Sequence, residues 1–260
     1  MIESEDKKLS VSEENQRVLF DKIAALYEAN YNDECSQRYR REFITKEILK
    51  NIDLRGKRVL EAMCGGGGLT DSLISQGALV TGLDISKEQI KIFNQKWKCD
   101  SICASMIDSG IEKESFDCVL VAGGLHHLYP FTSEAIQEIS RVLKPGGYFC
   151  FYEPHRGSIP DFFRRIWYAV DKLAEENEVP IDLLKLKKEF SKDFDFLSET
   201  FCGNLAYLLI FNSMFFRIPF SLKKALSGPL FKIERFVKKI QNRRLSCIVI
   251  GQWRKKNCRK

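Results

Sequence analysis

Apolar positions in the first 150 residues follow two alternating patterns. Short apolar runs predict five buried strands, at residues 57–62, 78–84, 100–104, 116–122 and 147–153. Longer stretches with helical spacing follow the first, second and fourth strands, and we expect their helices to begin near Gly67, Ser86 and Ser133. Strands that alternate with helices favour a parallel, doubly wound α/β sheet.

The segment before the first strand is predicted to be helical. Apolar residues recur there at helical spacing, namely Val18, Leu19, Ile23, Leu26 and Tyr27. A second helical run extends from about residue 36 to residue 52. We therefore expect a helical N-terminal region, residues 1–55, ahead of a doubly wound core at residues 56–154.

The alternation stops after Pro154. The segment Lys144-Pro-Gly-Gly separates the last helix of the core from the fifth strand, because proline ends a helix and glycine permits a tight turn. Residues 155–244 are predicted to form a cap, helical over residues 160–186. One side of that helix carries Trp167, Tyr168, Val170 and Leu173. Strand character returns at residues 245–253, which predicts a last strand that rejoins the sheet, followed by a basic tail to residue 260.

The composition is that of an ordinary globular chain, with 44% hydrophobic and 29% charged residues among 260. This excludes disordered, collagen-like and simple coiled-coil proteins. The first ten residues lack the apolar segment of a secretory signal, so we expect a cytoplasmic protein whose nine cysteines are thiols. The cysteines form no C-x-x-C pair and no cluster with histidine, and no metal site is predicted.

A run of four glycines, Gly65 to Gly68, is the strongest local signal. It follows an apolar strand and precedes a helix, at the sheet edge where glycine lets the backbone approach a ligand. Glu61 ends the strand before this loop, and Asp84 ends the next strand. A carboxylate at the second position can accept both hydroxyls of a ribose.

Two nucleotide-like ligands are compatible with such a loop. A dinucleotide pyrophosphate requires G-x-G-x-x-G without a neighbouring carboxylate, whereas here Glu61 would repel phosphate and Leu69 and Thr70 follow the glycines. The same carboxylate suits a ligand with an ammonium and a sulfonium group, which is S-adenosylmethionine. A NAD-dependent oxidoreductase is therefore the less favoured alternative.

Together these blocks resemble the small-molecule class I S-adenosylmethionine-dependent methyltransferases, in particular methyltransferase type 11. The resemblance implies O- or N-methylation of a small acceptor, with a lipophilic and a sugar-containing acceptor as the alternatives. The resemblance covers residues 18–153 and the last strand, and its motifs are Glu61–Gly67, Asp84, Ser115–Leu128 and Arg141–Gly147. It implies a Rossmann-like, doubly wound sheet of seven strands with an N-terminal helical lid and a C-terminal helical cap. Met63 stands where the family usually has a glycine, and it fits without strain if its φ is negative. If Met63 closed the site, the chain would instead be a methyltransferase-like binding protein.

The resemblance also implies which residues surround S-adenosylmethionine. They are Tyr27, Glu61, Ala62, Gly65, Gly67, Asp84, Ile85, Ser105, Met106, Ala122 and Gly123. Asp84 would bind the ribose, and Ile85 and Met106 would enclose the adenine. Ser105 replaces the usual acid after the third strand and can still hydrogen-bond the adenine amino group. The alternative for Ile85 and Met106 is core packing, and for Tyr27 an aromatic stripe on a packed helix.

Methyl transfer to a hydroxyl also requires a group that takes up a proton. The candidates are His126 and His127 after the fourth strand, Glu153 at the end of the fifth, and His155 just beyond it. Similar methyltransferases often place a histidine and a carboxylate at these two positions, so the hypothesis is that Glu153 acts with one histidine. Because His126 and His127 are adjacent, we expect at most one of them to point into the pocket.

Charge is distributed unevenly along the chain. Residues 201–260 contain 14 basic residues and one acid, Glu234, whereas residues 1–200 have a net charge of −7. The apolar stretch at residues 205–220 is interrupted by Asn212 and Arg217 and is too short to span a bilayer. One interpretation makes residues 205–210 the sixth strand, the phenylalanines a pocket lid and the lysines a solvated face. The others are peripheral membrane contact or a lipophilic acceptor, and, less favoured, RNA.

Overall fold

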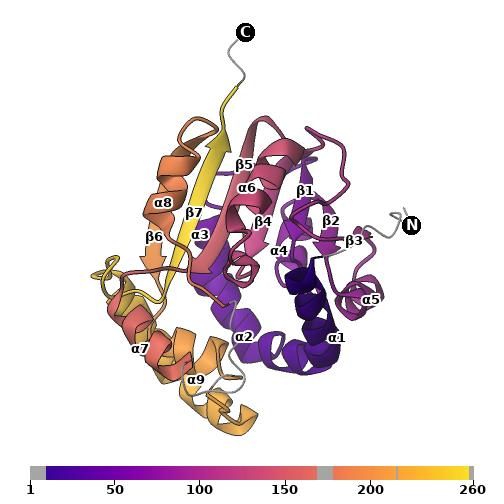
Figure 1. Cartoon of the computed structure of the whole chain (residues 1–260). Helices are drawn as coiled ribbons and strands as arrows, with labels where there is room; N and C mark the ends of the chain where they lie inside the picture. The colour runs from indigo at the N-terminus through magenta and orange to yellow at the C-terminus, as the bar shows by residue number, and fades with distance from the viewer. Residues whose placement is uncertain (1–9, 169–177, 215, 258–260) are drawn as a thin grey trace.

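A mixed sheet of seven strands forms the centre of the part of the chain that the computed structural model describes, residues 10–168, 178–214 and 216–257 (Figure 1). The strands are β1 (Arg58–Ala62), β2 (Leu79–Asp84), β3 (Asp100–Cys103), β4 (Phe116–Ala122), β5 (Leu143–Pro154), β6 (Phe194–Cys202) and β7 (Ile248–Lys255). Their order is β3-β2-β1-β4-β5-β7-β6. Strands β1 to β5 are parallel, as predicted, and β7 runs antiparallel to both of its neighbours. The predicted Rossmann-like, doubly wound architecture is confirmed.

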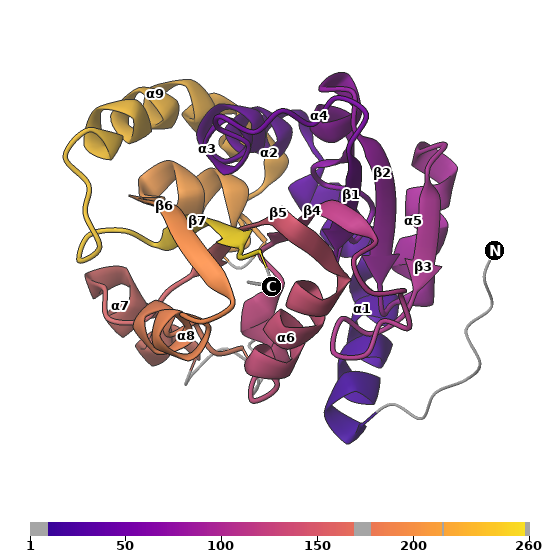
Figure 2. The ribbon, with the colours of Figure 1, turned by 90° about the horizontal axis from the view of Figure 1, so that it is seen from above.

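Helices cover both faces of the sheet (Figure 2). They are α1 (Val11–Tyr31), α2 (Glu34–Tyr39), α3 (Lys46–Ile48), α4 (Thr70–Ser75), α5 (Lys87–Lys96), α6 (Thr132–Val142), α7 (Ile159–Tyr168), α8 (Leu183–Glu189) and α9 (Phe220–Lys238). Three short turns complete the set: the π-helical η1 (Arg40–Thr45) and η3 (Tyr207–Phe211) and the 3-10 helix η2 (Leu125–Leu128). Seen from above, α3, α4 and α9 lie on one face and α6 and α8 on the other.

Alternation along the strands divides the core in two. Val59 and Cys118 belong to the apolar cluster under α2, α3 and α9, whereas their neighbours Leu60 and Val119 belong to the cluster under α6 and α8. Successive side chains of a strand point to opposite faces, so a strand covered on both sides reads as an unbroken apolar run. This explains why the apolar runs of the sequence predicted the central strands well.

The N-terminal helices begin at polar caps. Ser10 and Glu13 form a capping box at the start of α1, and Asp33 accepts hydrogen bonds from Cys35 and Ser36 at the start of α2. The predicted helix at residues 36–52 is in fact three pieces, α2, η1 and α3, that run on from one another. The Ser86 side chain caps α5, close to where that helix was expected.

Two predictions for the later elements are wrong. Residues 205–210 are not the sixth strand, because residues 207–211 form the buried turn η3 and the sixth strand is β6. The Lys144-Pro-Gly-Gly segment does not precede the fifth strand but lies inside β5 as an irregularity, where Phe116 pairs with Leu143 and Cys118 already pairs with Tyr148. In the predicted cap helix, Val170 and Leu173 lie outside the described residues, and α7 and α8 occupy the described parts.

Ion pairs join α9 to the N-terminal helices. Lys223 pairs with Asp33, Arg235 with Glu42, and Lys238 with Glu47. Part of the basic excess of the C-terminal third is therefore neutralised within the molecule. Among the described helices, none combines the length and the apolar character that a bilayer span requires.

Candidate active site

Two cavities lie next to each other at the carboxyl ends of β1, β2, β4 and β5. The smaller, of about 80 Å³, is surrounded by the glycine loop, Asp84 and residues of α1. The larger, of about 510 Å³, lies between α1, α7 and residues 207–216. Five residues line both cavities: Phe20, Tyr27, Gly123, His127 and Tyr152. The two spaces therefore share a wall, and a group held in one can face a group held in the other.

Two carboxylates shape the smaller cavity. Asp84 accepts hydrogen bonds from the backbone N–H of Gly65 at 2.8 Å and of Ser86 at 2.9 Å, and burial raises its pKa to about 6. Glu61 accepts from the N–H of Leu69 and the hydroxyl of Thr70, and burial raises the pKa of its carboxyl as well. Glu61 thus holds the far end of the glycine loop and Asp84 the near end, and both residues line the cavity.

Arg40 brings a positive charge to the same cavity. Arg40 is 8% exposed, and its guanidinium donates to the oxygen atoms of the Asn32 side chain and of the Gly68 and Tyr31 backbone. All three acceptors are neutral, and among the described residues no carboxylate forms an ion pair with Arg40. A buried cation is costly without a counter-charge, so this geometry fits a ligand that carries a carboxylate.

Further features of the smaller cavity fit an amino-acid nucleoside. The Nε2 atom of Gln16 and the Oε1 atom of Gln89 are buried without a hydrogen-bond partner, and both residues line the cavity. A Cβ on Gly68 would come within 3.2 Å of the Arg40 guanidinium carbon, so glycine keeps this wall open. At about 80 Å³ the space is smaller than the about 300–1,000 Å³ of typical ligand sites, because Gln16, Phe20 and Tyr27 of α1 close over it.

Most of the residues implied for the cofactor lie around this cavity. Its walls include Tyr27, Glu61, Gly65, Asp84, Ile85, Ser105, Met106, Ala122 and Gly123. Two expected residues do not: Ala62 is fully buried in β1, and Gly67 packs against Trp97, whose Nε1 would lie 2.3 Å from an added Cβ. Neither residue borders the cavity in this structure, so for Ala62 and Gly67 the role in cofactor binding stays a prediction.

Met63 adopts the conformation that the usual glycine would have. Its φ is +54°, in the left-handed region, so the condition of a negative φ is not met. The Met63 sulfur packs closely against Gly124: a Cβ added to Gly124 would lie only 2.7 Å from this sulfur. Met63 also forms part of the cavity wall. The loop therefore keeps a glycine-like backbone while a methionine side chain narrows the site.

The larger cavity is mainly apolar. Its lining comes from α1, α7 and the η3 region, with Leu19, Ile23, Tyr31, Phe163, Leu208, Phe211, Met214 and Phe216. The polar exceptions cluster around η2 and include His126, His127, Glu178 and Arg164, the last paired with Asp161 at 3.0 Å. The predicted phenylalanine-rich lid does border this space, although it is η3 and the following turn that supply it.

His126 is held by Glu153. The His126 Nδ1 atom lies 2.7 Å from Glu153 Oε2, and Glu153 also accepts from the backbone N–H of Gly124 and Leu125, each at 2.8 Å. Burial raises the pKa of Glu153 to about 8 and lowers that of His126 to about 3. Glu153 is completely buried and lines neither cavity, so of the hypothesised pair it is the residue that orients the histidine, His126.

His127 occupies the junction of the two cavities. Its Nδ1 lies 3.6 Å from Glu178 Oε1, and its ring meets that of Phe20 edge to face at 5.2 Å. Burial lowers its pKa well below the ordinary value. Because His126 also lines the larger cavity, the expectation that only one of the two rings could face the pocket is wrong: η2 turns tightly enough to bring both to one side.

His155 does not belong to the site. It is 1% exposed, its Nε2 lies 2.7 Å from the Ser246 hydroxyl, and its ring packs against Phe201. It lines neither cavity. Its prediction as a catalytic residue is wrong, because the chain beyond β5 pairs with Ile181 and carries the ring away from the pocket.

Comparison with known families bears on this geometry. A family described as "Methyltransferase domain" matches residues 60–151. The match includes the glycine loop, Asp84 and β5 up to residue 151, two residues before Glu153. Residues 60–151 therefore form a methyltransferase domain of this family. S-adenosylmethionine is the cofactor of such domains, and the methyltransferase domain here has its glycine loop at the expected strand end.

Curated relatives that match this part of the chain are themselves named as methyltransferases. A phthiotriol/phenolphthiotriol dimycocerosates methyltransferase of Mycobacterium ulcerans is 38% identical over 108 residues, which are 39% of each chain. A fatty-acid O-methyltransferase of Mycolicibacterium smegmatis is 30% identical over 139 residues, 51% of this chain and 50% of that one. The chain thus matches about two fifths to one half of these relatives' length.

The solved structure of a possible histamine N-methyltransferase from Thermotoga maritima shares the whole fold. It is 15% identical, has a TM-score of 0.64, and the match covers 92% of this chain and 99% of that one. At this identity the likeness shows the fold alone.

Four residues of the site could not be found from the motifs of the methyltransferase domain. Gln16 and Arg40 come from the N-terminal helices, and Arg164 and Glu178 from the cap region. No spacing in the sequence connects them to the glycine loop. The one available signal was the position of Arg40 in the predicted second helix, whose role depends on how that helix packs.

Proposed function

We propose that this protein transfers a methyl group from S-adenosylmethionine to a hydroxyl oxygen of a small, lipophilic acceptor. The observation that carries the proposal is the mainly apolar cavity of about 510 Å³ that shares a wall, including His127, with the cavity at the glycine loop. A volume of this size holds a drug-sized molecule. In this proposal residues 1–55 act as the lid, residues 56–154 as the cofactor-binding core, residues 155–244 as the acceptor cap, and residues 245–260 complete the sheet.

Several side chains would hold the cofactor. Asp84 would accept the ribose hydroxyls, Arg40 would pair with the carboxylate, and Ile85 and Met106 would enclose the adenine. When bound, S-adenosylmethionine supplies an electrophilic methyl group on a positively charged sulfur. Gly123 borders both cavities and leaves the passage between them open.

The histidines would receive the acceptor's hydroxyl. Both rings are neutral at pH 7 because burial lowers their pKa, so each has a nitrogen that can accept a hydrogen bond. Glu153 fixes the orientation of His126, and His127 lies nearest to the cofactor side. Phe20 and Tyr27 of α1 line the junction of the two cavities.

The cofactor part is tested by thermal unfolding with S-adenosylhomocysteine, with NAD, and with neither. A ligand at 100 times its dissociation constant stabilises by about 2.7 kcal/mol, which raises the midpoint by about 5–11 °C in a chain of this size. The shift should be lost in Asp84→Ala and retained in Asp71→Ala, an exposed acid on α4. A shift with NAD alone would favour an oxidoreductase, and no shift with either ligand would refute the proposal.

The acceptor part is tested with S-adenosylmethionine labelled in the methyl group and a panel of long-chain acids, lipid phenols and lipid alcohols. We expect label in a hydroxyl-bearing lipid. His127→Ala and Glu153→Gln should each reduce turnover by about 10²-fold without loss of S-adenosylhomocysteine binding. Full activity in both variants would eliminate the assigned role of the histidine cluster, and cofactor binding without turnover on any acceptor would favour a methyltransferase-like binding protein.

We further propose that the protein is cytoplasmic and docks at an anionic membrane surface through α9. The exposed side chains of Leu222, Ile233 and Phe236 are separated by eleven and three residues, which places them along one side of the helix. Lys232 and Lys239 are exposed beside this stripe. Apolar residues next to lysines are typical of an interfacial helix, and each basic residue contributes about 1 kcal/mol near anionic lipid.

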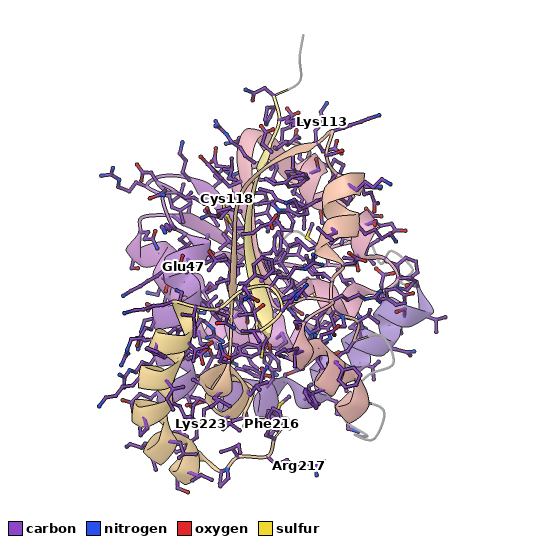
Figure 3. The ribbon with its side chains drawn as sticks, turned by 90° about the vertical axis from the view of Figure 1, so that its left-hand side faces the viewer. Glu47, Lys113, Cys118, Phe216, Arg217 and Lys223 are labelled. Atoms are coloured by element: carbon purple, nitrogen blue, oxygen red, sulfur yellow. The ribbon has the colours of Figure 1, made fainter. Side chains whose placement is uncertain are left out.

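The acceptor cavity reaches the side of the molecule on which α9 lies. Figure 1 shows α7 and α9 at its lower edge, and Figure 3 places Phe216 and Arg217 there as well. Phe216 and the exposed Phe163 line the cavity. A lipophilic acceptor could therefore enter from the surface that α9 contacts.

Vesicle flotation tests the docking surface. The protein should float with vesicles that contain phosphatidylglycerol and less well at higher salt, whereas Ile233→Ser with Phe236→Ser should stay in solution. Leu197→Ser, at an exposed apolar position on β6, serves as the matched control and should float like the unmodified protein. A gel shift with RNA but no flotation would favour an RNA partner and refute this surface.

A further inference from the structure

Three side chains with metal-binding atoms converge at the polar end of the larger cavity. His126, His127 and Glu178 each offer one donor atom, and these atoms all lie within 4.8 Å of one another. All three residues line the cavity. The two imidazoles come from η2 and the carboxylate from the segment that precedes Ile181, so the group is assembled by the fold and not by a sequence motif.

The surroundings of the two rings suit a metal site. The Nδ1 of His126 is hydrogen-bonded to Glu153 Oε2 at 2.7 Å, which leaves the Nε2 lone pair of His126 available to a metal ion. Histidine ligands usually have such a carboxylate on their second nitrogen, where it fixes the ring and its tautomer. The Nδ1 of His127 is buried and has no hydrogen-bond partner in the structure. A cation between the rings and Glu178 would satisfy this atom.

We propose that His126, His127 and Glu178 bind one divalent transition-metal ion, of which Zn²⁺ is the best match. Two imidazoles and one carboxylate suit such ions, and a fourth position would remain open toward the cavity, as in catalytic zinc sites. Bonds of about 2.0–2.2 Å require donors about 3–4 Å apart. Since the donor atoms lie within 4.8 Å of one another, the most widely separated pair would have to approach by about 1–2 Å.

The charges around the cluster are mixed. Glu178 brings a carboxylate to it, whereas Arg164, which is paired with Asp161, lies close enough for its positive charge to add to the effect of burial in lowering the pKa of His126. The donor atoms and their geometry, and not the net charge, therefore carry the proposal. This inference rests on the proposed function and deepens it: the ion would hold the oxygen of an acceptor hydroxyl and lower its pKa, so that the hydroxyl proton passes to solvent and the imidazoles, as ligands, do not have to accept it. The expectation of no metal site was drawn from cysteine spacing, which does not test this cluster.

The experiment uses the full chain without a histidine tag, treated with EDTA, desalted and titrated with Co²⁺ as a spectroscopic substitute for Zn²⁺. Metal content after gel filtration should reach one ion per chain, with visible bands of a nitrogen and oxygen site and no thiolate charge-transfer band. His127→Ala and Glu178→Gln should each weaken binding at least tenfold. Glu153→Gln should weaken it about 10–100-fold, as is typical for a residue that orients a ligand.

Two control variants distinguish this site from metal binding elsewhere on the chain. Glu88→Gln, an exposed acid on α5, and His155→Gln, a histidine outside both cavities, should bind like the unmodified chain. Circular dichroism confirms that each variant is folded. Every sample is also tested for stabilisation by S-adenosylhomocysteine, so that the two proposals can fail separately.

No stoichiometric Co²⁺ binding in a chain that S-adenosylhomocysteine still stabilises would overturn the metal site and leave the proposed function standing. Binding that is unchanged in folded His127→Ala and Glu178→Gln would place the ion elsewhere on the chain. A thiolate band would place the ion at cysteines. Either result would overturn the assignment as well. Binding at one ion per chain that is lost in these two variants, and retained in both controls, would establish the site.

Discussion

Lys223 should be the most stability-sensitive charge in the contact between the cap and the lid. It is 3% exposed, and its ammonium donates to the Asn30 carbonyl at 2.9 Å, to the Ser36 hydroxyl at 2.6 Å and to the Asp33 carboxylate. Figure 3 shows Lys223 at the lower end of the molecule. Lys223→Met would leave Asp33 buried without its counter-charge, which typically costs about 3–5 kcal/mol. The midpoint of thermal unfolding should fall by about 6–20 °C.

Lys224 provides the matched control, because it is exposed on the same helix. Lys224→Met should change the stability by less than about 0.5 kcal/mol. Asp33→Asn keeps the cap of α2, since asparagine is as good a cap as aspartate. The double variant of Asp33→Asn with Lys223→Met should lose less than the sum of the single changes, by about 0.5–3 kcal/mol. Equal midpoints for Lys223→Met and Lys224→Met would refute the buried ion pair.

Two further predictions concern the glycine loop and the histidine cluster. Gly67→Ala should destabilise more than Gly110→Ala by about 1–3 kcal/mol in urea unfolding: both glycines have positive φ, but only at Gly67 would a Cβ collide with Trp97. Equal losses would contradict this packing. His127 stays neutral in the folded chain while the unfolded chain binds a proton below about pH 6.5, so its contribution is complete above that pH and falls by about 2 kcal/mol at pH 5. The midpoint should therefore drop more between pH 7 and pH 5 in the unmodified protein than in His127→Gln, and parallel drops would argue against a buried neutral ring.

The central sheet could be predicted from the sequence because its strands are covered on both faces. β4 reads as an almost continuous apolar run for that reason. The sixth strand was missed because β6 lies at the edge of the sheet, where its sequence mixes Asp195, Ser198 and Glu199 with apolar residues. The apolar residues 207–211 instead fill the core beside α2 and α9, which any buried element can do. Apolar content alone does not distinguish these two cases.

The candidate site was predictable where a residue stands at the end of a strand. Asp84 and Gly123 fall at the cavity because parallel strands end at one edge of the sheet. Arg40 and Glu178 could not be found in this way, since they reach the site through the packing of helices and loops. Glu153 shows what its place at a strand end does not predict, namely the direction of the side chain. It stands at the end of β5 as expected, but its carboxylate accepts from the N–H groups of Gly124 and Leu125 at the start of η2 and does not line the acceptor cavity.

Helix α1 links the two halves of the site. Phe20 and Tyr27 line both cavities, and Tyr31 continues the same face by stacking on Tyr27 and donating to Asn212 in the cap at 3.1 Å. One helix therefore sets the size of both spaces. The cofactor side measures only about 80 Å³ in this position, so we expect α1 to move outward when a nucleoside enters. Because α1 also lines the acceptor cavity, such a movement would displace a wall of that cavity as well.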